Sequence, residues 1–213
     1  MEDDARDRVL RAARALFSAR GFAATGVDDL AGAARVTRSA LFELYEDKRE
    51  LFRAVFESME QELADTIVRG AGTETDPWEQ MRAGTRAFLR ACSDVAVRRI
   101  VLIDGPSVLG WDEWRRIDSR YAFAMVRTAL EANIAAGNLA EPSVDVLTHL
   151  YVGSLNEAAL AVAASEDVES RIDEFMATLD RVMDAQRLPR SRAAKHRRRS
   201  PTRDPSPRSA GRS

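Results

Sequence analysis

Three consecutive polar residues, Thr37, Arg38 and Ser39, have side chains that suit hydrogen bonding to phosphate oxygens and to the edges of bases. They open a short stretch of apolar periodicity, which predicts a helix with Thr37 as its N-cap and an end near Tyr45. The first N–H groups of such a helix are unpaired and favour phosphate. We expect Arg38 to contact a base, with a preference for guanine. A plain capping role for Thr37 can coexist with a DNA contact.

The residues typical of catalysis are not arranged for it. Gly21 and Gly26 have the glycine spacing of a phosphate loop, but Val and Asp follow where Lys and Ser or Thr are required. His149 lacks the Glu three residues earlier that a di-metal bundle uses, because Val146 occupies that position. Cys92 is most simply a small buried apolar residue. We therefore expect no catalytic activity, no metal and no cofactor.

The elements that position these residues are all predicted to be helices. Apolar residues recur at intervals of three and four between glycine and proline breaks, and no strand pattern appears. Two short helices with almost no connection, 27–34 and 37–45, must cross steeply, as in a helix-turn-helix unit. The segment 105–110 interrupts the helical pattern. The predicted helices are 4–20, 27–34, 37–45, 48–69, 77–93, 95–104, 111–136, 143–164 and 168–187.

The first 50 residues resemble the N-terminal domain of the TetR family of transcriptional regulators. The segments that carry this resemblance are AARALF at 12–17, GF at 21–22, TGVDDLA at 25–31, VTRSALF at 36–42, YEDK at 45–48 and LF at 51–52. The resemblance implies an all-α protein with a DNA-binding domain at 1–50, a connecting helix at about 48–69, and a helical ligand-binding and dimerisation domain at 70–188. By analogy with the family, Lys48 contacts phosphate, and the hydroxyls of Thr25 and Thr37 are lesser candidates.

The chain departs from the family at three positions of the expected reading helix. The family usually has Tyr and then often His where this chain has Phe42, Glu43 and Leu44. A phosphate-binding hydroxyl is therefore missing at Phe42, and a carboxylate stands beside the expected DNA surface. Residues 1–50 also hold nine basic and ten acidic side chains. Affinity for DNA must then come from the local placement of basic side chains or from another segment. Arg6, Arg8 and Arg35 are candidates for the local contribution.

The C-terminal tail is one candidate for that other segment. From Arg187 to the end there are ten Lys or Arg residues and one acid, although the whole chain has a net charge of −2. The composition of 189–213, rich in Arg, Ser and Pro, predicts disorder. This tail is either a solvated segment that assists solubility or a non-specific phosphate contact through residues such as Lys195 and Arg197.

The second domain contains aromatic residues at helical spacing, which are either core or the wall of an apolar pocket. With a few polar groups to orient a ligand, they form the predicted site for an unknown small molecule. The predicted pocket residues are Phe88, Asp104, Trp111, Trp114, Tyr121, Met125 and His149, with Tyr151 and Asn156 as further candidates.

The helix at 143–164 is apolar or small around most of its circumference and needs cover on more than one side. It is either a central core helix or, with 168–187, half of a four-helix interface between two copies of the chain. In the second interpretation the contact residues are Leu155, Ala158, Ala159, Val162, Phe175 and Leu179.

The sequence thus predicts a ligand-responsive, DNA-binding homodimer, most simply a repressor that a small molecule releases from its operator. Without a secretion signal or an apolar run of about 20 residues, we expect a cytoplasmic protein with no membrane partner. Two alternatives are a regulator with weakened DNA contacts that acts through a protein partner, and a helical enzyme.

Overall fold

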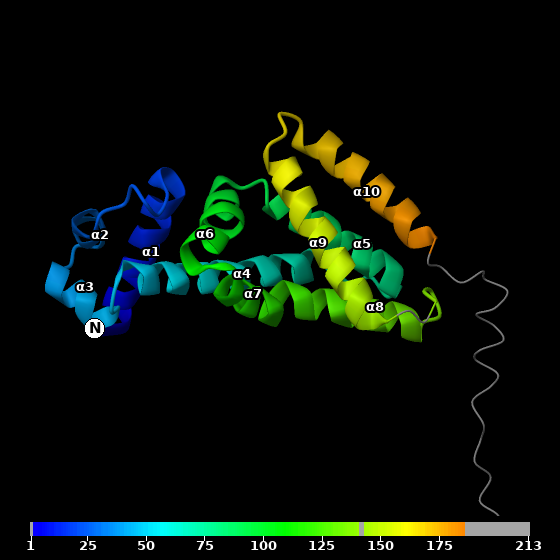
Figure 1. Ribbon diagram of the computed structural model, residues 1–213, viewed down its shortest axis with the longest axis horizontal. Coiled ribbons are helices and arrows are strands. Elements are labelled where there is room, and N and C mark those ends of the chain that lie inside the picture. Colours follow the sequence, from blue (N-terminus) through cyan, green and yellow to red (C-terminus); the bar gives the residue numbers. More distant parts are fainter. Residues whose placement is uncertain (1, 141–142, 186–213) are drawn as a thin grey trace, which may run out of the picture.

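The computed structural model describes residues 2–140 and 143–185, and this part of the chain is helical, as predicted. Figure 1 shows a small N-terminal group of helices and a larger helical part, with α4 extending from one into the other. The elements are α1 Glu2–Arg20, α2 Val27–Ala34, α3 Arg38–Leu44, α4 Lys48–Ala71, α5 Pro77–Ala91, the π-helix η1 Val97–Asp104, α6 Gly105–Leu109, α7 Trp111–Asp118, the π-helix η2 Ser119–Phe123, α8 Ala124–Ala135, α9 Val144–Ala163 and α10 Val168–Asp184.

The turn between α2 and α3 is short because the backbone closes on itself. Arg35 adopts a left-handed conformation with φ of 55°, and the N–H of Val36 donates to the carbonyl of Ala31 at 3.0 Å. This pattern ends a helix within one residue. The hydroxyl of Thr37 then accepts from the N–H of Ala40 at 3.1 Å, which starts α3. The helix-turn-helix unit is confirmed.

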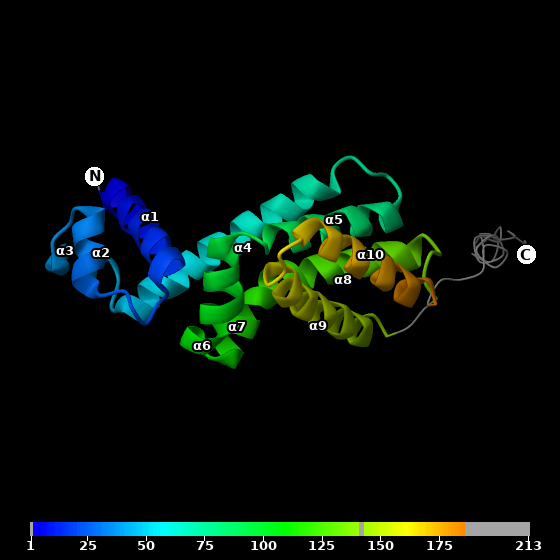
Figure 2. The ribbon, with the colours of Figure 1, turned by 90° about the horizontal axis from the view of Figure 1, so that it is seen from above.

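Helix α4 connects the two parts of the molecule. Its N-cap is Asp47, whose carboxylate accepts from the N–H of Glu50 at 2.7 Å. Its first half packs with α1 and α2, and its second half packs along α5. In Figure 2 it runs without interruption from beside α1 to α5. A movement of α4 in the larger part therefore reaches the N-terminal helices directly.

The two hydrophobic cores do not divide at the predicted boundary near residue 70. The first core contains α1, α2, α3 and the start of α4, but also Ile100, Val101, Leu109 and Trp114 from η1, α6 and α7. Gly105 permits this packing, because a Cβ at that position would lie 2.8 Å from the ring of Phe56. The second core lies between α5, α8, α9 and α10. The N-terminal helices are thus anchored on the larger part through α6 and its neighbours.

The segment 95–136 differs from its prediction. Helix α6 occupies 105–109, where an interruption was expected, and the break falls at Gly110, whose φ is 80°. The expected single helix 111–136 consists of α7, η2 and α8. A π-helix accommodates an extra residue in a helical turn. This changes the spacing of apolar residues too little to be detected in the sequence.

Helix α9 is long and apolar enough to cross a membrane by length and composition alone. In the fold it packs against α5, α8 and α10, and Ala159 and Val162 are completely buried. This position explains the apolar residues on the buried side of α9. The predicted tail, 189–213, lies outside the described residues.

Candidate functional site

The N-terminal end of α3 is exposed, with the side chains of Thr37, Arg38 and Ser39 on the surface. Phe42 is also exposed, one turn further along, at 38% of its full area. Leu41, which is completely buried, anchors the helix in the first core. The arrangement presents one guanidinium, two hydroxyls and the free N–H groups of a helix start to a ligand, and such groups suit phosphate and base edges.

Arg38 has two neighbours in the unbound protein. Its guanidinium donates to the carboxylate of Asp28 at 3.2 Å and lies 5.6 Å from the centre of the Phe42 ring. The Arg38 and Asp28 side chains are 60% and 83% exposed. An ion pair so exposed to water is worth at most about 1 kcal/mol. Arg38 is therefore held in place only weakly, and its guanidinium could exchange Asp28 for another acceptor at a small energetic cost.

The expectation that the Thr25 hydroxyl contacts DNA is wrong. Thr25 is 1% exposed, and its hydroxyl donates to the carbonyl of Gly21 at 2.8 Å. Gly21 ends α1 with a φ of 81° and leaves a carbonyl that needs a donor. The Thr25 hydroxyl supplies that donor, and its role is to hold the turn between α1 and α2.

Lys48 also stabilises this turn. Its ammonium donates to the carbonyls of Phe22 and Thr25, both at 3.0 Å, and lies 4.1 Å from the centre of the Phe22 ring. An ammonium has three protons, so one remains for a phosphate oxygen. The first residue of α4 thus clamps the segment that leads into α2, a structural role that the sequence did not reveal.

Three arginines near α3 provide local positive charge, although residues 1–50 as a whole hold nine basic and ten acidic side chains. Arg8 and Arg11 of α1 and Arg35 of the turn before α3 line a hollow of about 350 Å³. Arg8 also pairs with Asp4. Arg8 and Arg35 thus share one hollow between α1 and the end of α2, and their contribution to DNA binding stays a prediction.

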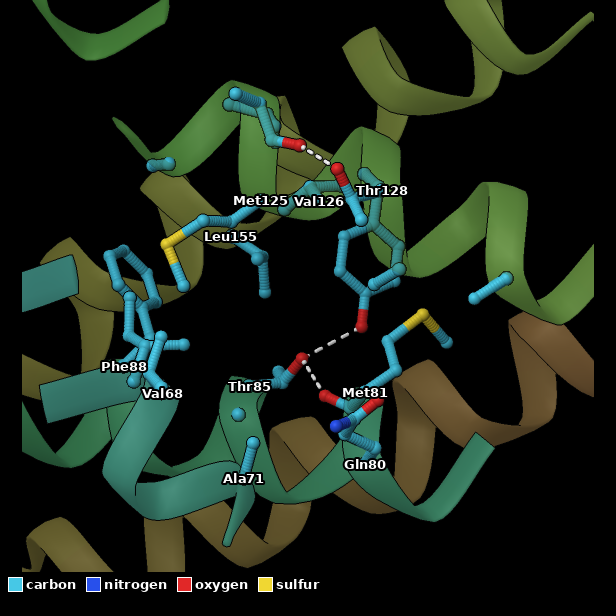
Figure 3. Close-up of a pocket in the computed structure, with 18 of the residues that line it drawn as sticks. Val68, Ala71, Gln80, Met81, Thr85, Phe88, Met125, Val126, Thr128 and Leu155 are labelled. Atoms are coloured by element: carbon cyan, nitrogen blue, oxygen red, sulfur yellow. Dashed lines mark hydrogen bonds between the residues drawn. The ribbon is translucent and has the colours of Figure 1, made fainter. Parts of the chain in front are cut away.

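The larger part contains a cavity of about 460 Å³, partly open to solvent, between α4, α5, α8 and α9. Its lining is largely aliphatic or aromatic and contains no charged side chain; its polar side chains are Gln80, Thr85, Thr128, Tyr151 and Asn156. Figure 3 shows Thr85 beside the hollow, with Phe88, Met125 and Leu155 also around it. A cavity of this size and composition suits a small organic ligand.

Two of the seven predicted pocket residues, Phe88 and Met125, line this cavity. The other five lie elsewhere, because the aromatic run at 111–123 packs toward the first core. Trp114 is buried there, Tyr121 packs against the same core, and Trp111 is 60% exposed and stacked on Trp114. The carboxylate of Asp104 accepts from the N–H of Phe22 at 2.9 Å. His149 is exposed beside Phe123.

Thr85 was missed as a pocket residue, and Tyr151 and Asn156 were only secondary candidates. The hydroxyls of Thr85 and Tyr151 lie 2.9 Å apart, and both residues are at most 5% exposed. A signal for Thr85 exists in the sequence, because it is the one hydroxyl among the inward residues Met81, Phe88 and Leu89 of α5. The small residues that leave the space empty, such as Ala71 and Gly84, carry no comparable signal.

Four of the predicted dimer contacts face the interior of the protomer. Leu155, Ala158, Ala159 and Val162 are at most 7% exposed, because the side of α9 that carries them packs on the second core. Phe175 and Leu179 of α10 are partly buried and keep some surface. The exposed side of α9 instead carries Val146, Leu150, Gly153 and Leu160.

Comparison with known proteins settles the family. The model of bacterial regulatory proteins of the tetR family matches residues 9–55, which include all of α2 and α3. The model of the tetracyclin repressor-like C-terminal domain matches residues 78–186. The chain belongs to the TetR family of transcriptional regulators. It is therefore a DNA-binding regulator of transcription, and proteins of this family act as dimers on DNA operators.

Individual relatives agree with this membership. This chain is 32% identical to a TetR-family transcriptional regulator from Pectobacterium atrosepticum. The match covers 88% of this chain and 96% of the relative, with a TM-score of 0.74. It is 22% identical to the transposon Tn10 TetC protein of Escherichia coli over 79% of this chain and 85% of TetC. The structure of RolR in complex with resorcinol shares the fold, at 18% identity, 96% and 98% coverage and a TM-score of 0.67.

Proposed function

We propose that this TetR-family regulator is a cytoplasmic homodimeric repressor that a small molecule releases from its operator. The observation that carries the proposal is the exposed start of α3, joined through α4 to a helical part with an apolar cavity. Thr37, Arg38, Ser39 and Phe42 form the DNA-facing surface, with Lys48 and the arginine hollow as phosphate contacts. In the dimer, two copies of α3 would enter successive major grooves about 34–36 Å apart.

The proposed dimer uses the exposed faces of α9 and α10, which lie beside each other in Figures 1 and 2. Leu150 and Val182 are 67% and 59% exposed, which is unusual for residues of their type. Gly153 lies between Leu150 and Leu160 on α9, and a Cβ added there would meet nothing within 4 Å. Two copies of these helices would bury the apolar stripe in a four-helix bundle.

The proposed release mechanism passes along α4. Ile67, Val68 and Ala71 of α4 line the cavity, and Lys48 at the other end of the same helix clamps the turn before α2. A ligand that displaces α4 would change the separation of the two reading helices. Such coupling is typically about 1–3 kcal/mol, or about 5–150-fold in operator affinity. The RolR complex with resorcinol supports a small-molecule effector, since it shows one protein of this fold with an aromatic ligand.

Replacement of Arg38 tests the DNA contact. We expect Arg38→Ala to weaken operator binding by about 1–3 kcal/mol and to relax preference at one base position, because only the guanidinium can bond a guanine edge in two places. Fluorescence anisotropy with the operator and a scrambled duplex measures both effects. Arg127→Ala, which removes a surface arginine of α8 whose side chain is 46% exposed, is the control. Discrimination by Arg38→Ala equal to that of the wild type would contradict the contact.

A further inference from the structure

The cavity contains a pair of hydroxyls whose hydrogens are already committed. The hydroxyl of Thr85 donates to the carbonyl of Met81 at 2.8 Å, and the Thr85 and Tyr151 hydroxyl oxygens are 2.9 Å apart. Figure 3 shows both hydrogen bonds of Thr85. A hydroxyl has one proton to donate. Since the proton of Thr85 points to Met81, the bond between the two hydroxyls must use the proton of Tyr151.

Tyr151 therefore meets a ligand as an acceptor. Its oxygen keeps unshared electron pairs after it has donated to Thr85, and burial raises the pKa of Tyr151 to about 12, so the hydroxyl stays neutral near pH 7. A ligand carbonyl or ether in contact with Tyr151 would find no free proton there. A ligand hydroxyl would supply the missing donor.

The described walls of the cavity favour an uncharged ligand. The residues lining the cavity include no Asp, Glu, Lys, Arg or His. A carboxylate or ammonium placed there would lose its water without gaining an opposite charge, which is strongly unfavourable. The amide side chains Gln80 and Asn156 can add neutral hydrogen bonds but no charge.

We infer that the effector is a neutral, largely apolar alcohol or phenol whose hydroxyl donates to the hydroxyl oxygen of Tyr151. This inference rests on the proposed function, because it takes the cavity as the effector site. It assigns a chemical class to the ligand and a specific role to the Thr85–Tyr151 pair, which fixes the direction of the hydrogen bond.

Four biphenyl probes test the inference by isothermal titration of the full chain at pH 7. We expect 4-phenylphenol to bind about 10-fold more tightly than 4-methoxybiphenyl or biphenyl, and biphenyl-4-carboxylate not to bind, because the loss of a hydrogen bond between neutral groups costs up to about 1.4 kcal/mol. Equal affinity for the phenol and the ether, tightest binding of the carboxylate, or no binding of the phenol would overturn the inference.

Three variants separate the role of the hydroxyl pair from shape. Tyr151→Phe should reduce the advantage of the phenol over biphenyl to about 2-fold or less, because the acceptor is gone. Thr85→Val should improve binding of the ether, because it frees the proton of Tyr151. Met125→Trp, which fills the hollow, should abolish binding of all four probes. An unchanged phenol preference in Tyr151→Phe would overturn the assignment of the acceptor.

Comparison of the titrations with an assay of DNA release distinguishes this inference from the proposed function. Binding of the phenol without release of operator DNA in an anisotropy assay would support the ligand class and contradict the effector role. Release of DNA by a carboxylate alone would support the effector role and contradict the ligand class. Operator binding by the ligand-free chain is measured separately and depends on neither result.

Discussion

Leu150→Glu is expected to convert the dimer to monomers and to weaken operator binding by roughly 100-fold or more. Leu150 is 67% exposed on α9, so a charge costs the single protomer little. In a dimer the same carboxylate would be buried against its copy, where two unpaired charges are strongly unfavourable. Monomers also lose the linkage of two half-sites, which contributes about 10²–10⁴-fold to affinity. Sedimentation velocity and anisotropy measure the two effects.

Val95→Glu is the matched control for this prediction. Val95 is 69% exposed, like Leu150, but it lies between α5 and η1 rather than on α9 or α10. We expect this variant to remain dimeric with unchanged operator affinity. A dimeric Leu150→Glu protein with wild-type affinity would show that the interface lies elsewhere.

The second large effect concerns Glu60, a buried acid in the middle of α4. Glu60 is 3% exposed; burial, with a smaller contribution from the charge of Asp118, raises its pKa to about 8. Asp118 is also buried, and its pKa is raised to about 6 by burial, against the opposing effect of Arg115. Both carboxyls therefore bind protons more tightly in the folded chain than in the unfolded one.

The free energy of unfolding should fall as pH rises from about 4.5 to about 8. In that range Glu60 is ionised in the unfolded chain but stays protonated in the folded chain. Because the pKa of Glu60 is higher in the folded state, rising pH favours the unfolded state. Glu60→Gln cannot ionise. We expect the free energy of unfolding of Glu60→Gln to exceed that of the wild type by about 3–5 kcal/mol at pH 8 and to match it within about 1 kcal/mol at pH 4.5.

Urea unfolding between pH 4.5 and 8, at one protein concentration, measures this difference. Glu62→Gln is the control, because Glu62 lies on the same helix and its side chain is 52% exposed. Its unfolding free energy should follow the wild-type pH dependence within about 1 kcal/mol. A difference between Glu60→Gln and the wild type that does not grow with pH would contradict the raised pKa.

Much of the fold follows from local sequence signals. The bounds of α2, 27–34, are those predicted. Helix α3 begins directly after its Thr37 cap, as predicted, because a capping hydroxyl is a short-range signal. The π-helical form of η1 and η2 escaped prediction, since an extra residue per turn leaves the apolar spacing nearly unchanged. Helix α6 escaped because Gly105 and Pro106 at its start resemble a break in the helical pattern. Gly110 marks the true break through its positive φ.

The site was less predictable than the fold because it depends on which faces meet. The exposure of Arg38 depends on how α3 packs, because Leu41, three residues further along the same short helix, is buried. Helix α9 is apolar on nearly every side, so its pattern cannot tell the buried Ala159 from the exposed Leu150. The cavity exists because small residues on three helices leave space together, and no single residue announces it.

The central claim is that two copies of α3 read one operator together. Selection of bound fragments from random DNA with the purified full chain tests it most directly. The account predicts enrichment of two inverted half-sites with centres about 10 base pairs apart, and relaxation of one base in each half when Arg38→Ala replaces the wild type. Enrichment of a single unpaired half-site, or no enrichment at low salt, would contradict it.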